Sequence, residues 1–563
     1  MKDTGSLSAA GIRKREESGM ARVTNDGLGF SRRDFVVKGA AAGAALAASS
    51  VAGTGSADAA RGGSGGPADL ALVNGNILTL DANNTVAGSI AITDGHISAV
   101  TPHGGNDANQ VIDLRGATVI PGLNDSHIHF IRLGIDPGYG VRDIEVAQSI
   151  NELQQNVAAR ATTVPAQAFI TCIGGWNRAG LKENRLPTQA ELNAAAPSNP
   201  VYLVESGGGG AGITNTAAAA FFTSHGVPVN ADGTVSNTTN AKNALVAVQT
   251  DADRLRSTAE AVDHATGLGL TMIQDMGGLI GLSSYAYSLQ LWAEKKLNIR
   301  IRYFNWSGDD PGITEMETRI ANQLNQLGDS RYYAIGVGER VHNSTTDPIN
   351  IQAYQFAAQN GWTLTQHSLT PAEIAFHIGA YQQAAQVGPI DKLRWSLCHV
   401  DPITDAQIAQ VKAMGIGLNI QGYGYIRAAG ANSGPPFRSL VASGIPLGAG
   451  TDATVVGPMD PWLMMSFMTT GKNNAGLVSG MPGQQISRLQ ALQMYTSGSA
   501  YLSFDDESMG TIEVGKYADL AVLSANPLYA DEQTFRRITS NLTLVGGKIV
   551  NRSGPFANLN TNQ

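Results

Sequence analysis

Cysteine is nearly absent from this sequence of 563 residues. Its two cysteines, Cys172 and Cys398, are too few for a disulfide framework or a cysteine-based zinc site. A single disulfide between them stays open, and two buried thiols are the simpler expectation.

Positive charge is also in short supply. Lysine and arginine number 38 against 46 acidic residues, which gives a formal net charge of -8 and a pI of about 5.7. Nucleic-acid-binding proteins are usually basic, so this balance argues against that class and leaves a small-molecule substrate open. Because 43% of the residues are hydrophobic, the chain can build a sizeable core, and global disorder is not expected.

Long apolar runs are missing, and the one candidate stretch lies near the N-terminus. It follows Arg32 and Arg33, is rich in Ala and Gly, and is too short to span a bilayer well. Paired arginines, such a stretch and the small-residue site Ala57-Asp58-Ala59 are typical of a twin-arginine signal peptide. We predict a signal peptide over 1–59, a linker over 60–67, and export to the periplasm or the extracellular space without stable membrane insertion.

Short strands with turn signals occupy both ends of the remaining chain. "LALVNGNILTL" and "SIAITDGHISAV" carry Asn74-Gly75 and Asp94-Gly95, and "LTLVGGKIVN" carries Gly546-Gly547. Such pairs favour two-residue hairpins, because both central residues need a positive φ. We predict one small composite β-sandwich from residues 68–121 and 508–553.

Between these ends, apolar strand candidates alternate with helical stretches. This alternation favours a (β/α)₈ TIM-like barrel over residues 122–507. An open doubly wound sheet is the alternative, weakened by the lack of a G-x-G-x-x-G motif after the first strand. There are more than eight strand candidates, so we assign "AFITCIGGW" and "VYLVES" to an inserted subdomain around residues 140–260.

Histidines and acids stand at the ends of several predicted strands. His127 and His129 in "PGLNDSHIHF" are two apart, so on a strand their side chains point to the same side. Later strand candidates end at Asp275, Glu339, His367, His399 and Asp452. Active sites of (β/α)₈ barrels lie at the C-terminal strand ends, and converging imidazole and carboxylate groups suit Zn²⁺ or a similar ion. We expect Asp275 to orient a neighbouring loop by hydrogen bonds rather than to bind metal.

The motifs "PGLNDSHIHF", "TLTQHS", "LCHV" and "AGTDA" follow one another in this order between the β-rich ends. In this the chain resembles the amidohydrolase superfamily of metal-dependent hydrolases. Within it, the chain is similar to the YtcJ-like branch, which includes N-substituted formamide deformylases. The resemblance covers about Ala68 to Val550 and implies a barrel set in a split β-sandwich.

The resemblance also implies roles for individual residues. His127 and His129 would bind the more buried metal, and His367 and His399 would bind a second metal or position the substrate. Asp452 would bind metal and act as the catalytic general base.

One ligand departs from the family pattern. The family's bridging ligand after the fourth strand is usually a carboxylated lysine and sometimes a glutamate. "YAIGVGERVHN" has no lysine, so we expect Glu339 to bridge. The number of ions, one or two, stays open, and Zn²⁺ is the expected metal.

The sequence says less about the substrate pocket than about the metal ligands. Relatives often carry a histidine where this chain has "ESGGGGAGITNT", a change that affects substrate choice more than metal binding. Weak substrate-binding candidates are His342, Tyr423 and Trp176. An exposed loop is the preferred interpretation for His342, and a core position for Trp176. The Gly- and Pro-rich stretch after Tyr423 is either a mobile lid or a loose surface loop.

The sequence therefore predicts an exported amidohydrolase that cleaves the C–N bond of a linear amide, formamide or carbamate. The expected mechanism is attack by a metal-bound hydroxide with Asp452 as base. A cyclic amidase or an esterase using the same site, and a non-catalytic metal- or ligand-binding barrel, are the alternatives. The expected partner is a small molecule; no nucleic acid is expected, and a homo-oligomer stays open.

Overall fold

The computed structural model describes residues 67–559, except for 105–106, 207–209, 278–284, 307–311, 323–324, 343, 427–429 and 454–455. The predicted signal peptide over 1–59, and all of the predicted linker except its last residue, lie outside the described residues. Within the part that is described, no helix combines the length and the apolar character needed to cross a bilayer.

Eight parallel strands form the central sheet and confirm the predicted (β/α)₈ barrel. In spatial order they are β8 (Leu123–Ile128), β14 (Leu270–Asp275), β15 (Arg300–Asn305), β16 (Tyr332–Val337), β17 (Thr363–Ser368), β18 (Ser396–His399), β19 (Gly417–Ile420) and β20 (Leu447–Ala449). Just beyond β20, the Asp452 amide donates to the His127 carbonyl at 2.8 Å, which nearly closes the barrel. Both faces of the strands are covered, since every residue of β8, β14, β18, β19 and β20 is buried, the polar ones included.

Helices alternate with these strands along the chain, and several begin at a residue whose side chain caps the first turn. They are α7 (Asp251–Gly267), α8 (Ala286–Ala293), α9 (Thr314–Asn322), α10 (Ile349–Gln359), α11 (Pro371–Ala384), α12 (Asp405–Met414) and α13 (Phe437–Ser443), followed by α14 (Pro461–Thr470) and α15 (Arg488–Gln493). Helix α11 begins with a Thr370–Glu373 capping box and a proline in its first turn.

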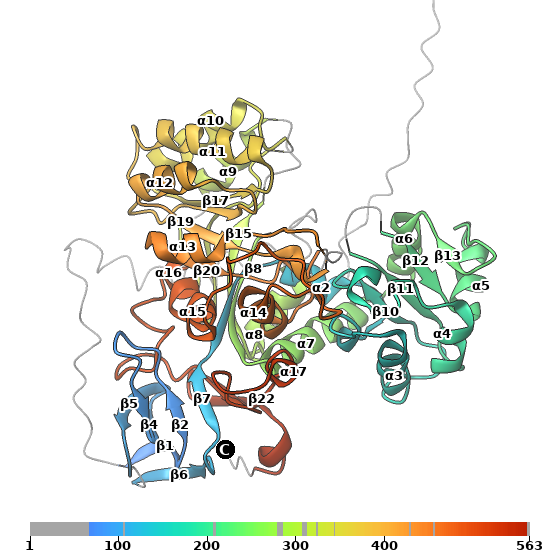
Figure 1. The fold of residues 1–563 in the computed structure, drawn as a ribbon, viewed down its shortest axis with the longest axis horizontal. Helices are drawn as coiled ribbons and strands as arrows, with labels where there is room; N and C mark the ends of the chain where they lie inside the picture. Colours follow the sequence, from blue (N-terminus) through green and yellow to red (C-terminus); the bar gives the residue numbers. More distant parts are fainter. Residues whose placement is uncertain are drawn as a thin grey trace, which may run out of the picture. The chain divides into compact units, whose positions relative to one another are not determined.

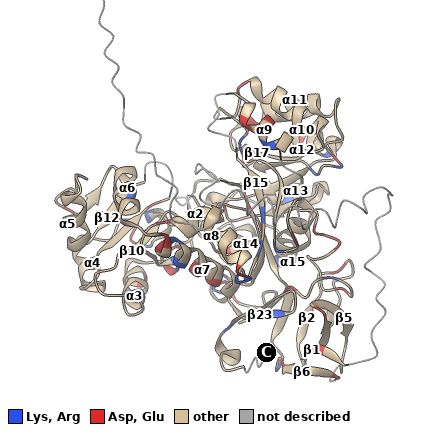
Figure 2. Ribbon diagram, turned by 180° about the vertical axis from the view of Figure 1, so that it is seen from behind, with Lys and Arg blue, Asp and Glu red and all other residues tan. Residues whose placement is uncertain are grey.

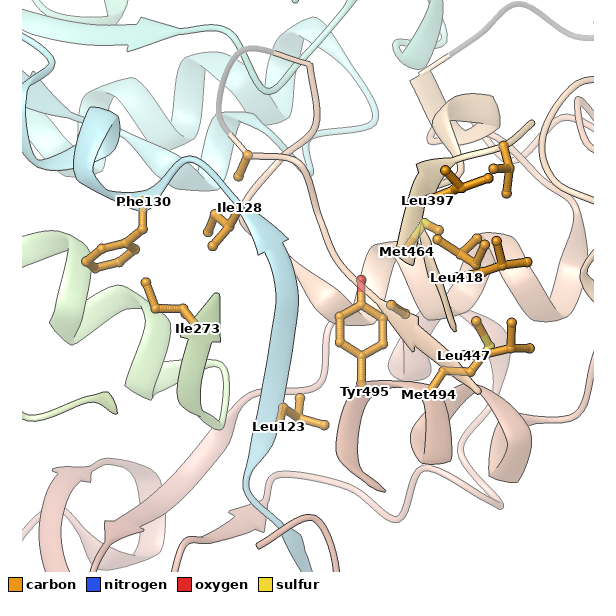
Figure 3. Packing of buried hydrophobic residues seen from close by; sticks show 14 of the residues in the cluster. Leu123, Ile128, Phe130, Ile273, Leu397, Leu418, Leu447, Met464, Met494 and Tyr495 are labelled. Carbon is orange, nitrogen blue, oxygen red and sulfur yellow. The ribbon is translucent and has the colours of Figure 1, made fainter. Parts of the chain in front are cut away.

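The apolar strand residues pack into one large core. Figure 3 shows Ile128 and Phe130 beside Ile273, with Tyr495 and Leu447 in another part of the same cluster. Two arginines buried beside this core are paired with aspartates: Arg300 with Asp519 and Arg302 with Asp505, each pair at 2.8 Å. At the surface, acidic and basic residues lie side by side around α7, as Figure 2 shows.

Strands from both ends of the chain share one sheet. Strand β7 (Thr118–Pro121) pairs antiparallel with β21 (Leu520–Leu523) (Figure 1). The six-stranded sheet also holds β2 (Asn76–Leu78), β3 (Val86–Ala87), β22 (Ser540–Val545) and β23 (Lys548–Arg552). A four-stranded sheet contains β1 (Ala68–Val73), β4 (Ser89–Thr93), β5 (His96–Thr101) and β6 (Ala108–Asp113), and apolar residues of both sheets form one cluster.

Two of the three predicted hairpin turns form. Asp94-Gly95 joins β4 to β5 and Gly546-Gly547 joins β22 to β23, all four residues with positive φ. The hairpin predicted at Asn74-Gly75 is wrong, because β1 pairs with β4 and β6 and has no free edge for β2. Asn74, at φ 56°, instead turns the chain from one sheet into the other.

The segment after the first barrel strand makes a sheet of its own. Its five strands are β9 (Tyr139–Gly140), β10 (Ile170–Ile173), β11 (Val201–Val204), β12 (Gly212–Thr214) and β13 (Thr234–Val235), accompanied by α3 (Ile150–Ala161), α4 (Gln189–Ala195), α5 (Thr216–Ser224) and α6 (Thr238–Val248). The two strand candidates set aside from the barrel, "AFITCIGGW" and "VYLVES", contain β10 and β11. Glu145 of this segment accepts a hydrogen bond from the Met459 amide, which ties it to the chain after β20.

Candidate metal centre

Six side chains that the sequence singled out converge at the C-terminal ends of the barrel strands. They come from β8 and the residue after it, from the loops after β16 and β20, and from β17 and β18; they are His127, His129, Glu339, Asp452, His367 and His399. Five strands therefore contribute to one point, which is why no local stretch of sequence contains the whole site.

One group of ligand atoms surrounds Asp452. Its Oδ1 lies 3.2 Å from His129 Nε2 and 3.5 Å from His127 Nε2. The three residues are buried, and each offers one ligand atom within 4.8 Å of the others. This arrangement can hold one metal ion.

A second group surrounds Glu339. Glu339 Oε2 lies 3.1 Å from His367 Nδ1, 3.2 Å from His399 Nε2 and 3.5 Å from His127 Nε2. Its other oxygen, Oε1, lies 3.5 Å from His129 Nε2. The Glu339 carboxylate thus reaches all four histidines and stands between the two groups of ligand atoms.

Hydrogen bonds from outside the cluster set the orientation of the imidazoles. The Gly277 carbonyl lies 2.7 Å from His129 Nδ1, so that nitrogen carries the proton and Nε2 faces the carboxylates. Asp275 accepts hydrogen bonds from the Gly277 and Ile131 amides. It therefore holds the backbone beside His129, the loop-orienting role expected for it.

Asp125, which the sequence analysis did not single out, connects His127 of β8 with the residues that follow β20. Its carboxylate accepts hydrogen bonds from the His127 amide, the Thr451 amide and the Thr451 hydroxyl. Burial raises the pKa of Asp125 to about 7, against the lowering effect of these bonds. The sequence could have indicated this role, because Asp125 stands two residues before His127 in the same strand.

The electrostatics of the centre favour a bound cation. Burial alone would raise the pKa values of Glu339 and Asp452, but the histidines around them hold both well below the usual range. Conversely, burial would lower the pKa of His129, but Asp452 and Glu339 raise it well above its usual value. Two buried carboxylates thus favour positive charge in this site, which a divalent ion could supply.

The donor set fits a borderline divalent ion. His127 is fully buried, and neither of its ring nitrogens has a hydrogen-bond partner among the described residues. His399 Nε2 and His367 Nδ1 lie 2.8 Å apart. Two nitrogens this close could both donate a lone pair to one metal ion. Imidazole nitrogens with carboxylate oxygens are the ligands of Zn²⁺ and similar ions.

The three weak substrate candidates fall in different places. Tyr423 touches the centre, since its hydroxyl lies 2.6 Å from His399 Nδ1 and 2.5 Å from Asp452 Oδ2. Trp176 is buried in the hydrophobic cluster of the inserted sheet, a core position. The preferred interpretation of His342 as an exposed loop residue is wrong, because its side chain is buried and contacts the backbone of Ser344.

The two loops that the sequence analysis linked to the substrate pocket are described only in part. In "ESGGGGAGITNT", residues 207–209 lie outside the described residues, and the buried Glu205 forms two hydrogen bonds with the Arg178 side chain. In the stretch after Tyr423, residues 427–429 lie outside them as well. The choice between a lid and a surface loop therefore stays a prediction.

His377 supplies a pH-dependent contribution to stability. It lies on α11 and is buried, and its ring nitrogens face the Ser368 hydroxyl and the Thr345 carbonyl. Burial lowers its pKa to about 4 from an ordinary value of 6.5. Between pH 6.5 and about 4 the unfolded chain binds the extra proton, so stability falls as the pH falls through this window.

We expect His377→Gln to lose less free energy of unfolding than wild type as the pH falls from 6.5 to about 4. The difference is on the order of 3 kcal/mol. The measurement is urea unfolding of wild type and variant between pH 7 and 4 in excess chelator, so that metal release does not contribute. An equally steep acid loss in the variant would show that His377 is not the group responsible.

Comparisons with known proteins agree with this geometry. The model of the amidohydrolase family matches residues 110–551. N-substituted formamide deformylase of Arthrobacter pascens is 23% identical over 535 residues, covering 85% of this chain and 97% of the relative. YtcJ of Bacillus subtilis (strain 168), whose name calls it an amidohydrolase, is 22% identical over 503 residues, covering 79% and 91%.

Solved structures share the fold. An uncharacterized metal-dependent hydrolase from Pyrococcus horikoshii superposes with a TM-score of 0.56 at 21% identity, covering 82% of this chain and 99% of that one. The zinc complex of atrazine chlorohydrolase TrzN from Arthrobacter aurescens superposes with a TM-score of 0.52 at 16% identity, covering 86% and 95%.

Proposed function

The chain belongs to the amidohydrolase family, and from this premise we propose that it hydrolyses the C–N bond of a linear amide, with N-substituted formamides as the leading class. The observation that carries the proposal is the convergence of four histidines, Glu339 and Asp452 at the mouth of the barrel. The substrate class is supported by the similarity to N-substituted formamide deformylase, which extends over nearly the full length of that relative.

We propose two divalent ions, Zn²⁺ being the best match to the ligands. His127, His129 and Asp452 would hold one ion, His367 and His399 the other, and Glu339 would lie between them. Such ions, when bound, lower the pKa of water toward ~7 and polarise a carbonyl oxygen.

The chain's own contribution to the reaction is proton transfer and orientation. The Asp452 carboxylate takes one proton from the attacking water as the oxygen adds to the carbonyl carbon. It then passes this proton to the nitrogen as the C–N bond breaks. The second hydrogen of the water stays on the new carboxyl group, so a formamide and water yield an amine and formic acid, which ionises to formate. Because histidine ligates only when neutral, acid should release the metal and end activity.

The test is a substrate panel on zinc-loaded protein: para-nitroformanilide, the matching acetanilide, a hydantoin and para-nitrophenyl acetate. We expect the formanilide to be hydrolysed fastest, with turnover lost in chelator and restored by Zn²⁺. Preferred hydrolysis of the hydantoin or of the ester would move the assignment to those classes. A metal-loaded protein that turns over none of the four would favour the non-catalytic binding barrel.

We also propose that the protein is exported by the twin-arginine route. The support lies in the sequence alone: Arg32 and Arg33 precede an alanine-rich stretch and an Ala-x-Ala site. Replacing both arginines by lysine in the full chain should leave the protein uncleaved inside the cell. Unchanged export of that variant would contradict the proposal.

A further inference from the structure

We propose that Tyr423 is a positioning residue whose single hydroxyl orients both His399 and Asp452. The inference rests on the function proposed above. Tyr423 lies in the 3-10 turn Tyr423–Ile426, directly after β19, and its side chain is buried. Its hydroxyl lies 2.6 Å from His399 Nδ1 and 2.5 Å from Asp452 Oδ2. It therefore connects a residue of one ligand group with a residue of the other.

The chemistry of the three groups fixes the direction of both hydrogen bonds. An ionised carboxylate only accepts, so the phenolic proton goes to Asp452 Oδ2. The phenol then has no second proton, and toward His399 its oxygen can only accept. His399 Nδ1 must carry the hydrogen of that contact, which leaves the lone pair on Nε2.

This tautomer is the one that the centre needs. His399 Nε2 is the nitrogen that lies 3.2 Å from Glu339 Oε2 and 2.8 Å from His367 Nδ1. The other tautomer would place a hydrogen on Nε2 and point it at the ligand atoms. Tyr423 therefore selects the form of His399 that can bind metal.

The same hydroxyl orients the Asp452 carboxylate. With Oδ2 held by Tyr423, Oδ1 faces His127 and His129 at 3.5 and 3.2 Å. A carboxylate oxygen has more than one acceptor site, so Oδ2 keeps room for a proton while it is held. Rotation of the carboxylate would break both arrangements together.

Close packing holds Tyr423 in place. It is flanked by Gly422 and Gly424, and a Cβ on Gly424 would come within 2.0 Å of the Phe467 ring. The Gly424 carbonyl also accepts a hydrogen bond from the Ser479 hydroxyl. The glycines thus allow the turn to lie against α14, which explains the composition of "QGYGY". With its one proton on Asp452, the hydroxyl has none to donate to a substrate.

Tyr423→Phe removes only the hydroxyl. The matched control is Tyr381→Phe, because Tyr381 is also fully buried and its hydroxyl donates to Ser396 on β18, the strand that carries His399. Two readouts are measured on each full-length protein: zinc affinity by competition with a chelator, and kcat and KM for para-nitroformanilide at saturating zinc. Zinc affinity needs no turnover, so it tests the inference even if the proposed function fails.

We expect Tyr423→Phe to weaken zinc binding and to lower kcat, each by about 10- to 100-fold, with KM changed by less than about three-fold. The Tyr381→Phe protein should match wild type in both. Zinc affinity and kcat of Tyr423→Phe within about two-fold of wild type would overturn the inference. Equal losses in the two variants would also overturn it, because a general packing defect would then explain them.

Discussion

Asp452→Asn is expected to lower kcat by about 10²- to 10⁴-fold, the contribution of a well-placed general base. Asparagine keeps the size of the side chain and an oxygen at the ligand position, but its amide cannot take a proton from water. We therefore expect metal to stay bound while hydrolysis of para-nitroformanilide is lost. The measurements are kcat at saturating zinc and metal content of the same sample.

The matched control is Asp460→Asn, another buried aspartate whose carboxylate caps α14 through the Trp462 and Leu463 amides. Asparagine is as good an N-cap residue as aspartate, so the substitution keeps the cap of α14. The kcat of the Asp460→Asn variant should lie within about two-fold of the wild-type value. If Asp452→Asn kept wild-type turnover, Asp452 would not be the base and the assignment of the proton-transfer step would be wrong.

Glu339→Gln is expected to remove about one metal equivalent per chain and to lower kcat by at least about 10²-fold. The physical reason is that Glu339 reaches all four histidines and carries the negative charge between the two ligand groups. A neutral amide has only one oxygen to offer, and its NH₂ group would face ligand nitrogens or the ions. Elemental analysis and steady-state kinetics on the same preparation check both parts.

Glu191→Gln is the control for this substitution, since Glu191 caps the exposed start of α4 and glutamine supports the same capping box. It should match wild type in metal content and turnover. A Glu339→Gln protein that retained the wild-type metal content would show that this carboxylate is not a bridge. The ions would then be held by the histidines and Asp452 alone.

The barrel and its candidate metal ligands could be predicted from sequence because five of the eight barrel strands carry or directly precede one of these residues. His127, His129, His367 and His399 lie at the C-terminal ends of β8, β17 and β18, which is where active sites of such barrels are found. The missing lysine in "YAIGVGERVHN" pointed to Glu339, and the structure brings this acid among the histidines.

Other features depend on contacts that no local pattern carries. Asn74-Gly75 reads as a hairpin turn, but the long-range pairing of β1 with β6 takes the edge that a hairpin would need. His342 and His377 look like ordinary loop and helix residues, yet both are buried by packing from distant segments. Tyr423 was only a weak substrate candidate, since its distance to Asp452 depends on how the last strands come together.

Metal content per chain tests the central claim most directly. The protein is purified without chelator, dialysed against metal-free buffer and analysed for all divalent transition metals. The proposed centre predicts close to two equivalents, with zinc the main metal. About one equivalent would limit the site to a single ion and remove the bridging role of Glu339. A protein that binds no divalent ion, even after incubation with excess Zn²⁺, would contradict the assignment of this chain as a metal-dependent hydrolase.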